Sequence, residues 1–419
     1  GWSCPTPLRK PGARPWWSDR ACEIAKDCYG SMSQQILVVR SPVITAAAFL
    51  IAIGFGVSLP LISMRVEATG VSGAWIGLNA AMPALGWITG SALLPFLQIR
   101  LGVPFKRLLQ MFLGLGLMAL FGLRYADGYA EMTALRFLFG GAIGVVFRLI
   151  EFWINDVTGK DDRGRNIGIY NILFMVGLII GSMLQPSFGV MGWAAFAPPL
   201  LMMVLGLVAL QFWSGQPSPA VETAIPPSAY GIVLSVPVAL LCVLAYGIYE
   251  SAPTTLMPVY VLRNNLDSAT AAHTLTAAAL GNLILQYPVT AISDRIGRTL
   301  PMLICASTVA ATSAMIPQAL GNETLFLAVV ALWGGAAGTL YSMALAMIGD
   351  RFHGGQLVVA NAAFGIVYAV GSIAGPIVNG FAIDQMNTHG LMVLLAITFA
   401  VLSVVILVAQ IVGVVRGRA

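Results

Sequence analysis

Four charged side chains lie inside long apolar stretches of the sequence, in a chain of 419 residues of which only 9% are Asp, Glu, Lys or Arg. Arg148 and Glu151 are three residues apart in VVFRLIEFWIND, so they can pair on one face of a helix. Arg136 precedes them, and Glu250 lies in YGIYESAPTTLMP with no basic residue nearby. Such a group costs about 2.5 to 3.5 kcal/mol at the centre of a membrane helix, so we expect a partner or a hydrated cavity beside it.

The carboxyl group of Glu250 could exchange a proton or bind a solute. Pro253 and Pro258 follow it and permit a bend, because proline leaves backbone carbonyl groups without their helical donor. The alternative for Glu250 is a structural acid held by hydrogen bonds. For Glu151 the alternative is a side chain that reaches the nearby cytosol and anchors its helix.

The composition indicates a membrane protein, because 58% of the residues are hydrophobic and the mean hydropathy is +0.85. A helix needs about 20 apolar residues to cross a bilayer. Stretches of that length recur here without the alternation that is typical of membrane β-barrels. We therefore expect an all-α membrane protein with twelve transmembrane helices, near residues 43–63, 72–95, 106–125, 132–154, 166–187, 191–213, 230–256, 270–292, 300–319, 324–348, 357–381 and 390–414.

The basic residues predict the orientation of these helices. With both termini in the cytosol, most Lys and Arg residues fall in inner segments, and the outer segments hold Arg65, Arg124 and Arg263. The net charge of +5 reflects this orientation and gives no indication of nucleic-acid binding. We expect no metal and no cofactor, since the sequence has neither a cluster of metal ligands nor a nucleotide-binding glycine-rich loop.

The sequence contains an internal repeat, in which glycines of several helices and one loop recur 193 to 195 residues later. The pairs are Gly54 with Gly247, Gly102 with Gly297, Gly140 with Gly334, Gly144 with Gly338, Gly177 with Gly371, and Gly181 with Gly375. Six helices return the chain to the side where it began, so both halves cross the membrane in the same direction. We expect two six-helix bundles related by pseudo-symmetry, with a seam near the midplane, where secondary transporters bind their substrates.

The repeat and the composition predict the domain boundaries. We expect an N-terminal bundle at 41–213 and a C-terminal bundle at 230–415, joined by a cytoplasmic linker at 214–229 whose prolines oppose a helix. Residues 1–40 form an extension that we expect to be disordered or not native, because Met32 resembles a natural start. The cysteines of this extension match no zinc pattern.

Over residues 40–415 the sequence resembles the major facilitator superfamily. The segment SDRIGRT matches the Asp-Arg-x-Gly-Arg gating motif of that family through Asp294, Arg295, Gly297 and Arg298. The equivalent loop of the first half, QIRLGVP, keeps Arg100 and Gly102 of this motif. RFLFGGA is similar to the family's Arg-x-x-Gln-Gly motif, with Arg136 in place, and the Arg-x-x-Glu-x-Trp that starts at Arg148 resembles a bacterial subgroup labelled as efflux proteins.

The resemblance implies a monomeric transporter that moves a small solute across the bacterial inner membrane by alternating access. It also implies a central cavity lined by the first, fourth, seventh and tenth helices, and thus by Glu250, Glu151, Arg148, Arg136, Ser58, Tyr249 and Tyr341. We expect protons to drive transport through Glu250. Three substrate classes are compatible with the sequence: a lipophilic cation, an organic anion and a sugar.

Two functions compete with transport on the same scaffold: a nontransporting sensor and a lipid flippase. An enzyme is not expected, because no pair of nucleophile and base stands out.

The repeat also predicts two cytosolic ion pairs, Arg100 with Asp156 and Arg295 with Asp350, each bracing a loop against the end of the fourth or tenth helix. Asp294 would face the start of the eleventh helix, where a carboxylate is favoured. Inward opening would break these contacts. The alternative is the ordinary excess of cytosolic charge, which contributes little to stability when it is solvated.

Overall fold

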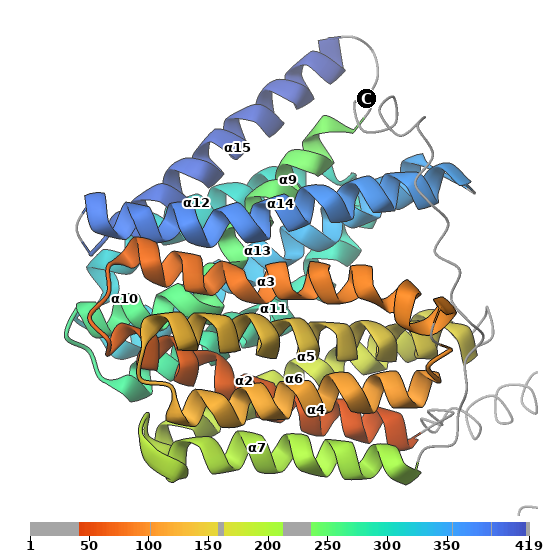
Figure 1. The fold of residues 1–419 in the computed structure, drawn as a ribbon. Coiled ribbons are helices and arrows are strands. Elements are labelled where there is room, and N and C mark those ends of the chain that lie inside the picture. Colours follow the sequence, from red (N-terminus) through yellow and green to blue (C-terminus); the bar gives the residue numbers. More distant parts are fainter. Residues whose placement is uncertain are drawn as a thin grey trace, which may run out of the picture. The chain divides into compact units, whose positions relative to one another are not determined.

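The computed structural model describes residues 42–100, 102–157, 163–212, 236–353, 355–386 and 388–415. Their elements are helices (Figure 1), in the order α2 (Pro42–Glu67), α3 (Gly73–Pro95), η1 (Phe96–Arg100), α4 (Phe105–Tyr125), α5 (Tyr129–Val157), α6 (Arg163–Leu184), η2 (Gln185–Phe188), α7 (Gly192–Ala209), η3 (Leu210–Phe212), α9 (Pro237–Ser251), η4 (Ala252–Leu256), α10 (Met257–Arg263), α11 (Ser268–Ile296), α12 (Thr299–Ala319), α13 (Glu323–Arg351), α14 (Gly355–Gln385) and α15 (Gly390–Val415). The expectations for residues 1–40 and for the linker at 214–229 fall outside the described residues.

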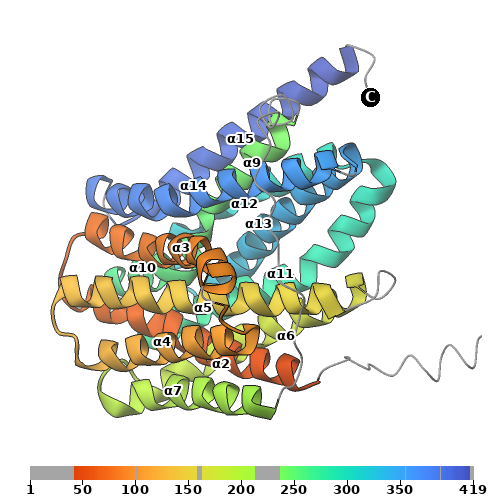
Figure 2. The ribbon, with the colours of Figure 1, turned by 45° about the vertical axis from the view of Figure 1, so that its right-hand side comes forward.

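Eleven helical segments among the described residues are long and apolar enough to cross a membrane, by length and composition. One of them, Pro237–Arg263, comprises α9, η4 and α10. The remaining long helix, α3, coincides with the second of the twelve expected spans. It lies between α5 and α14 and packs along both (Figure 2).

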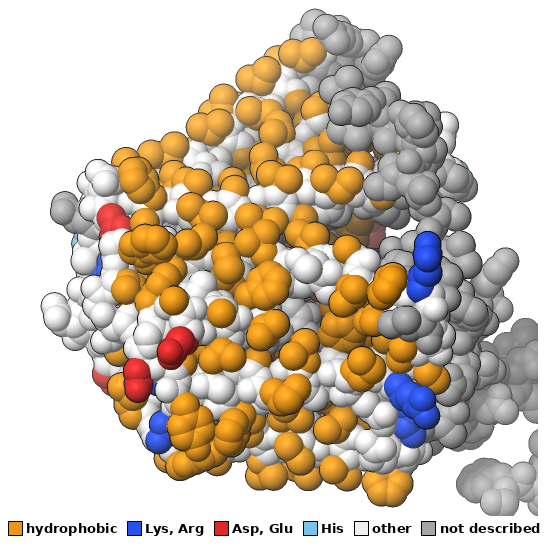
Figure 3. Space-filling model, in the orientation of Figure 1, with side chains coloured by type: hydrophobic (Ala, Val, Ile, Leu, Met, Phe, Trp, Pro, Cys, Tyr) orange, Lys and Arg blue, Asp and Glu red, His pale blue; other side chains and the backbone are white. Residues whose placement is uncertain are grey.

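The surface of the described helices is strongly apolar. Hydrophobic side chains cover the middle of the face shown in Figure 3, and charged side chains gather at its two ends, with basic ones on the right. Large apolar side chains are exposed in several helices; Met118, for example, is 66% exposed and Tyr287 is 80% exposed. Water would make such a surface unfavourable, whereas lipid would not. The chain is therefore a multi-pass membrane protein.

Equivalent helices of the two halves pack at equivalent glycines. A Cβ atom on Gly86 of α3 would overlap the carbonyl oxygen of Phe137 in α5. A Cβ atom on Gly281 of α11 would overlap the carbonyl oxygen of Ala331 in α13. Gly281 follows Gly86 by 195 residues, and Ala331 follows Phe137 by 194. The sequence repeat is thus also a repeat of contacts, made where small residues let two backbones approach.

A second set of contacts repeats in the same way. Gly181 of α6 lies against the backbone of Ile53 in α2. Its counterpart Gly375 of α14 lies against the backbone of Ile248 in α9. Helix α6 therefore packs on α2 in the same way as α14 packs on α9. This agrees with the sequence repeat, which pairs Gly181 with Gly375.

We predict that Gly86→Ala and Gly281→Ala destabilise the protein to a similar extent, by about 1 to 3 kcal/mol, because each added methyl group meets a backbone carbonyl that cannot rotate away. The measurement is the temperature at which each purified variant in detergent loses its single size-exclusion peak.

Gly114→Ala is the matched control. No atom outside its own helix lies within 4 Å of a Cβ at Gly114, so this variant should keep or slightly raise the melting temperature. Equal melting temperatures for all three variants would show that the close approach at Gly86 and Gly281 is not required.

Candidate functional site

A cavity of about 240 Å³ lies between helices of the two halves of the chain. Helices α2, α3 and α5 form one side, and α9, η4 and α14 form the other. Its polar lining consists of Arg136, Glu250, Ser251, Thr254, Thr255 and Ser372. Aromatic rings of Phe55, Trp87 and Tyr368 complete the wall. The cavity therefore offers one permanent positive charge, one carboxyl group and several hydroxyl groups beside an apolar surface.

Arg136 of α5 is almost fully buried, with an exposed fraction of 2%. Its Nη1 donates to Oδ1 of Asn79 in α3 at 2.7 Å. Its Nη2 donates to the hydroxyl oxygen of Thr255 in η4 at 2.8 Å and approaches that of Ser63 in α2 at 3.4 Å. These partners come from both halves of the chain, so the guanidinium group joins them inside the molecule.

The position of Thr255 follows from a local irregularity of the helix. Residues Ala252–Leu256 form a π-helical turn between α9 and α10, and Pro253 lies within it. Proline has no N–H to donate to the preceding turn, which explains why the regular α-helical pattern is interrupted here. Such turns occur often at functional sites. The result is that Thr254 and Thr255 line the cavity one turn beyond Glu250.

Glu250 of α9 lies on the cavity wall as expected. Its Oε2 accepts a short hydrogen bond from the Tyr368 hydroxyl and a second one, at 3.2 Å, from the Ser372 hydroxyl; both donors lie on α14. No described residue donates a hydrogen bond to Oε1, and no described basic side chain forms an ion pair with Glu250. One carboxylate oxygen is thus fixed by hydroxyl groups while the other can meet a proton or a solute.

Five residues expected in the cavity do not line it, and three of them are uncharged. Ser58 is fully buried, and its hydroxyl donates to the carbonyl of Phe55 in its own helix at 2.7 Å. The ring of Tyr249 packs against Trp333, with ring centres 4.5 Å apart. Tyr341 packs against Tyr246, with ring centres 4.7 Å apart. These side chains belong to the packing around the site in this structure.

Arg148 and Glu151 form the expected pair within α5, with 3.9 Å between Nη1 and Oε2. Neither lines the cavity that contains Arg136 and Glu250. Their side chains are 56% and 42% exposed. The pair therefore lies apart from the buried polar contacts, nearer to the end of α5 at Val157.

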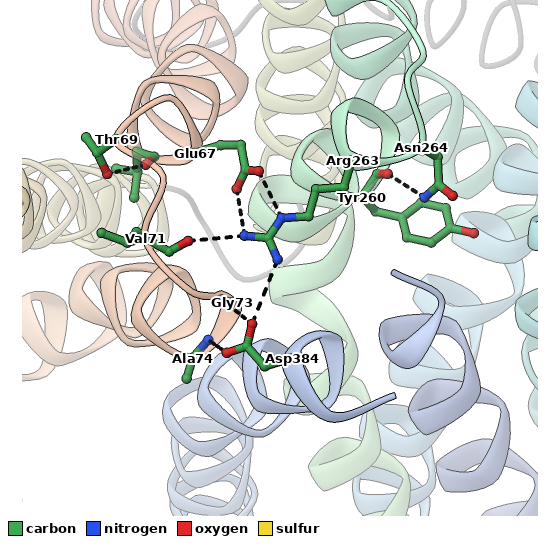
Figure 4. Close-up of polar contacts among 10 residues, drawn as sticks. Glu67, Thr69, Val71, Gly73, Ala74, Tyr260, Arg263, Asn264 and Asp384 are labelled. Atoms are coloured by element: carbon green, nitrogen blue, oxygen red, sulfur yellow. Dashed lines mark hydrogen bonds and ion pairs between the residues drawn. The ribbon is translucent and has the colours of Figure 1, made fainter. Parts of the chain in front are cut away.

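Charged residues at the opposite end of the helices also join the two halves (Figure 4). Arg263, at the end of α10, binds Glu67, at the end of α2, in a bidentate manner, with distances of 2.9 and 3.1 Å. Its Nη1 lies 3.9 Å from Oδ1 of Asp384 in α14. The side chains of the three residues are about one-fifth exposed, at 19 to 24%. We refer to Glu67, Arg263 and Asp384 as the Arg263 cluster.

Asp384 also caps the start of α3. The backbone N–H of Gly73 donates to Oδ1 at 2.6 Å, and that of Ala74 donates to Oδ2 at 2.8 Å. The first N–H groups of a helix have no partner within the helix, so a carboxylate at this position is favoured by hydrogen bonding and by the helix dipole. The Arg263 cluster thus attaches α2 and α3 to α10 and α14.

Several residues of these contacts are not expected from the sequence. Tyr368 and Ser372 lie on α14, the eleventh expected span, whereas the family resemblance implies a cavity on the first, fourth, seventh and tenth. Arg263 stands out in the sequence only as an outer basic residue. An arginine against the positive-inside rule, together with acidic residues at neighbouring helix ends, is the sequence signal that could have predicted the cluster.

The expected ion pairs at the other end of the helices differ in detail. Asp350, at the end of α13, is bound through Oδ2 by Nε of Arg298 and through Oδ1 by Nη2 of Arg298 at 3.2 Å, and not by Arg295. This hydrogen bonding raises the pKa of Arg298. Asp294 also pairs with Arg298, at 3.1 Å. Whether Asp294 also faces the start of α14 is not tested, because Gly354 lies outside the described residues. Arg298 binds Asp350 in place of Arg295 because the turn at Gly297 separates the two arginines: Arg295 belongs to α11, and Arg298 lies at the start of α12.

That turn explains the glycine of the motif. Gly297 has a φ angle of +88°, and its counterpart Gly102 has a φ angle of +61°. Residues with a side chain rarely adopt this conformation, whereas glycine does so freely. The predicted pair of Arg100 with Asp156 is not tested, because the side chain of Asp156 lies outside the described part; Arg100 itself is exposed at the end of η1.

Comparisons with known proteins agree with this architecture. The family model described as Major Facilitator Superfamily matches residues 44–317 and 239–413. A Bacillus subtilis (strain 168) protein, named as the uncharacterized MFS-type transporter YfkF, is 25% identical over 356 residues, which cover 82% of this chain and 89% of that protein.

Solved structures with a similar fold include two transporters. The nucleoside transporter NupG matches with a TM-score of 0.70 at 14% identity, covering 89% of this chain and 99% of that one. A D-xylose-proton symporter matches with a TM-score of 0.65 at 17% identity, covering 85% of this chain and 96% of that one.

We predict that Arg298→Gln lowers the stability of the protein and that Arg295→Gln does not, because among the described residues only Arg298 binds Asp350. The loss should be at most about 1 kcal/mol, since the side chain of Asp350 is 59% exposed and solvent screens the pair. Thermal unfolding at low and high salt measures it.

The two arginines are three residues apart, so each variant is the control for the other. Asp350→Asn should have at most the effect of Arg298→Gln, because Arg298 keeps its contact with Asp294, and it should add nothing in the double variant. A larger effect of Arg295→Gln would mean that the sequence-based pairing describes the protein better.

Proposed function

The chain belongs to the major facilitator superfamily, and from this membership we propose that it is a secondary transporter that moves a small solute by alternating access to the cavity between its two halves. Members of this family are transporters rather than enzymes. The observation that carries the proposal is the cavity itself, because residues from both halves surround Arg136 and Glu250. A site at such a seam can open to one side of the membrane and then to the other when the halves rock.

The proposed arrangement is two six-helix bundles, one from residues 41–213 and one from 230–415. The repeated contacts support it, because α3 packs on α5 as α11 packs on α13, and α6 packs on α2 as α14 packs on α9. We place both termini in the cytosol and the protein in the inner membrane, in accordance with the distribution of Lys and Arg in the sequence. The Arg263 cluster then lies on the outer side.

The Arg263 cluster supports alternating access because it ties the two halves together at the end of the helices that we place on the outer side. Glu67 and the start of α3 belong to the first half, and Arg263 and Asp384 belong to the second. At the opposite end, the contact of Arg298 with Asp350 stays within the second half. We assign this conformation to a state that is closed on the outer side, and outward opening requires the Arg263 contacts to break.

We assign proton coupling to Glu250, with Arg136 and the pair of Arg148 and Glu151 in supporting roles. Glu250 is the carboxyl group of the cavity lining, and its fixed oxygen is held by Tyr368 and Ser372 whether or not the other oxygen carries a proton. The fold is compatible with such coupling, since a structure of similar fold is named as a proton symporter.

We predict that Glu250→Gln abolishes proton-driven flux while leaving solute binding in place. Glutamine keeps an oxygen that can accept the hydrogen bonds of Tyr368 and Ser372, but it cannot take up or release a proton. The measurement uses liposomes that contain the reconstituted protein and a pH-sensitive dye. Solutes are chosen by a thermal-shift screen, since a ligand of the folded state stabilises it by mass action.

Glu131→Gln is the control for this experiment, because Glu131 is an exposed carboxyl group on α5 outside the cavity lining. It should behave as the wild-type protein does. Proton flux that persists in Glu250→Gln would remove Glu250 from the mechanism. If the wild-type protein moves no solute of any class, a sensor or a flippase becomes the better assignment.

We predict that Arg263→Gln makes the cavity more accessible from the outer side, because Glu67 and Asp384 then lose the cation that joins them. The reporter is Thr254→Cys in a background without the native cysteines, modified by an impermeant thiol reagent from outside. The rate should rise about tenfold, the factor that corresponds to about 1.4 kcal/mol.

Arg124→Gln is the control, because it also removes a positive charge from the outer side of the protein. Arg124 lies at the outer end of α4, where it contacts the rings of Tyr125 and Trp193, and it does not join the two halves. Its variant should leave the modification rate unchanged. An equal rate in Arg263→Gln and the wild-type protein would show that the cluster does not control outward opening.

A further inference from the structure

The positive charge of Arg136 is not neutralised by a neighbouring acid. The oxygens that accept its hydrogen bonds belong to an amide and two hydroxyl groups, on Asn79, Ser63 and Thr255. None of the described carboxylates forms an ion pair with it. A guanidinium group remains charged in proteins, and a buried charge without a counter-ion is costly. An anion in the cavity would therefore be stabilised at this place.

Hydroxyl groups beside Arg136 are set to donate to the same anion. Thr255 accepts its bond from Arg136 through Oγ1, and Ser251 accepts one from Nδ2 of Asn379 at 3.4 Å. No described acceptor takes the hydroxyl proton of either residue. Both residues line the cavity, one turn apart on the same segment. Near Arg136, the hydroxyl groups of Ser251 and Thr255 can therefore donate to a solute, while their oxygens already accept bonds from the protein.

We propose that the solute of this cavity is a small organic anion, whose acidic group binds Arg136 together with the hydroxyl groups of Ser251 and Thr255. The inference rests on the proposed transport function and names its substrate class. A solute bound in this way contacts α5 of the first half and the α9 to η4 segment of the second. Its acidic group therefore bridges the two halves.

The cavity also limits the size of the anion. A protein cavity of about 150 Å³ holds benzene, and drug-sized ligands occupy about 300 to 1,000 Å³. The volume here, about 240 Å³, lies between these limits. The rings of Phe55, Trp87 and Tyr368 provide an apolar wall for the rest of the solute. The fit is to an acid with a compact apolar or aromatic body.

A cationic solute fits the same cavity less well. It would have to bind Oε1 of Glu250, because Oε2 already accepts bonds from Tyr368 and Ser372. It would also share the cavity with the permanent charge of Arg136, and like charges repel strongly where water is scarce. Protonation of Glu250, in contrast, leaves the cavity with a net positive charge that an anion balances. An anion and a proton can therefore occupy the cavity together.

The test compares three probes of about ten non-hydrogen atoms each, a size that suits a cavity below the usual range of ligand pockets. They are benzenesulfonate, benzenesulfonamide and phenyltrimethylammonium, with charges of minus one, zero and plus one. A sulfonate remains ionised and does not cross the bilayer by itself as a protonated acid. The full-length wild-type protein in detergent should show a higher melting temperature with benzenesulfonate only.

Variants of the site decide whether the probe binds at Arg136. In Arg136→Gln the affinity for benzenesulfonate should fall at least about tenfold, as expected for the loss of a charge-assisted hydrogen bond. Arg136→Lys should recover part of it, because the charge remains but the planar fork does not. Thr255→Val, which keeps the shape of the side chain, should weaken binding as well and provides a second variant if Arg136→Gln does not fold.

Arg124→Gln is again the control, since it removes the same charge outside the cavity. It should bind benzenesulfonate as the wild-type protein does. The inference is overturned if benzenesulfonate does not stabilise the wild-type protein, if it stabilises Arg136→Gln equally, or if the neutral or cationic probe stabilises the wild-type protein more.

Flux of the three probes into proteoliposomes separates this inference from the proposed function. Benzenesulfonate that binds at Arg136 but is not moved would preserve the anion site and contradict transport. Movement of phenyltrimethylammonium without binding of benzenesulfonate would preserve transport and contradict the anion site. Movement of benzenesulfonate that is lost in Arg136→Gln supports both.

Discussion

A buried guanidinium group between the two halves of the chain is the constraint on which the interior depends. Arg136 does not lose its charge readily and is almost fully buried, so neighbouring helices supply oxygen atoms to it. Asn79 and Ser63 do so from the first half, and Thr255 does so from the second. The π-helical turn at Pro253 places Thr255 in the same cavity as Glu250. The hydrogen bonds to the Arg136 guanidinium group thereby bring together the helices that line the cavity.

The surrounding helices meet a different constraint, which is packing without a hydrophobic driving force. Lipid is as apolar as the side chains, so helices associate through close contact of small residues and through internal hydrogen bonds. The glycines of α3, α5, α11 and α13 provide that contact, and the repeat places them at equivalent positions in both halves. Asp384 adds a polar attachment between α14 and the start of α3. Close glycine contacts also join the two halves, because a Cβ atom on Gly77 of α3 would overlap the carbonyl oxygen of Pro376 in α14.

The candidate site was partly predictable because charge is costly in an apolar helix. Arg136 and Glu250 were recognisable for that reason and line the cavity, whereas Arg148 and Glu151, recognised on the same ground, do not. Neutral residues carry no such signal. Tyr249 and Ser58 were expected in the cavity and lie outside it, whereas Tyr368 was not expected there and binds Glu250. A helix with lipid on one side and protein on the other is apolar all round, so its sequence does not reveal which side chains face inward.

The sequence by itself determined the helical membrane class, the approximate spans, the internal repeat and the family. The first three follow from local composition or from spacing along the chain, and the family follows from the motifs that this sequence shares with it. Only the tertiary structure decided the partners across helices: Asp350 binds Arg298 rather than Arg295, and Arg65, expected in an outer segment, binds carbonyl groups at the end of α4. Arg263 likewise gains its importance from Glu67, which is 196 residues away. Such pairs depend on the rotation and register of neighbouring helices, and on turns such as the one at Gly297, which separates Arg295 at the end of α11 from Arg298 at the start of α12.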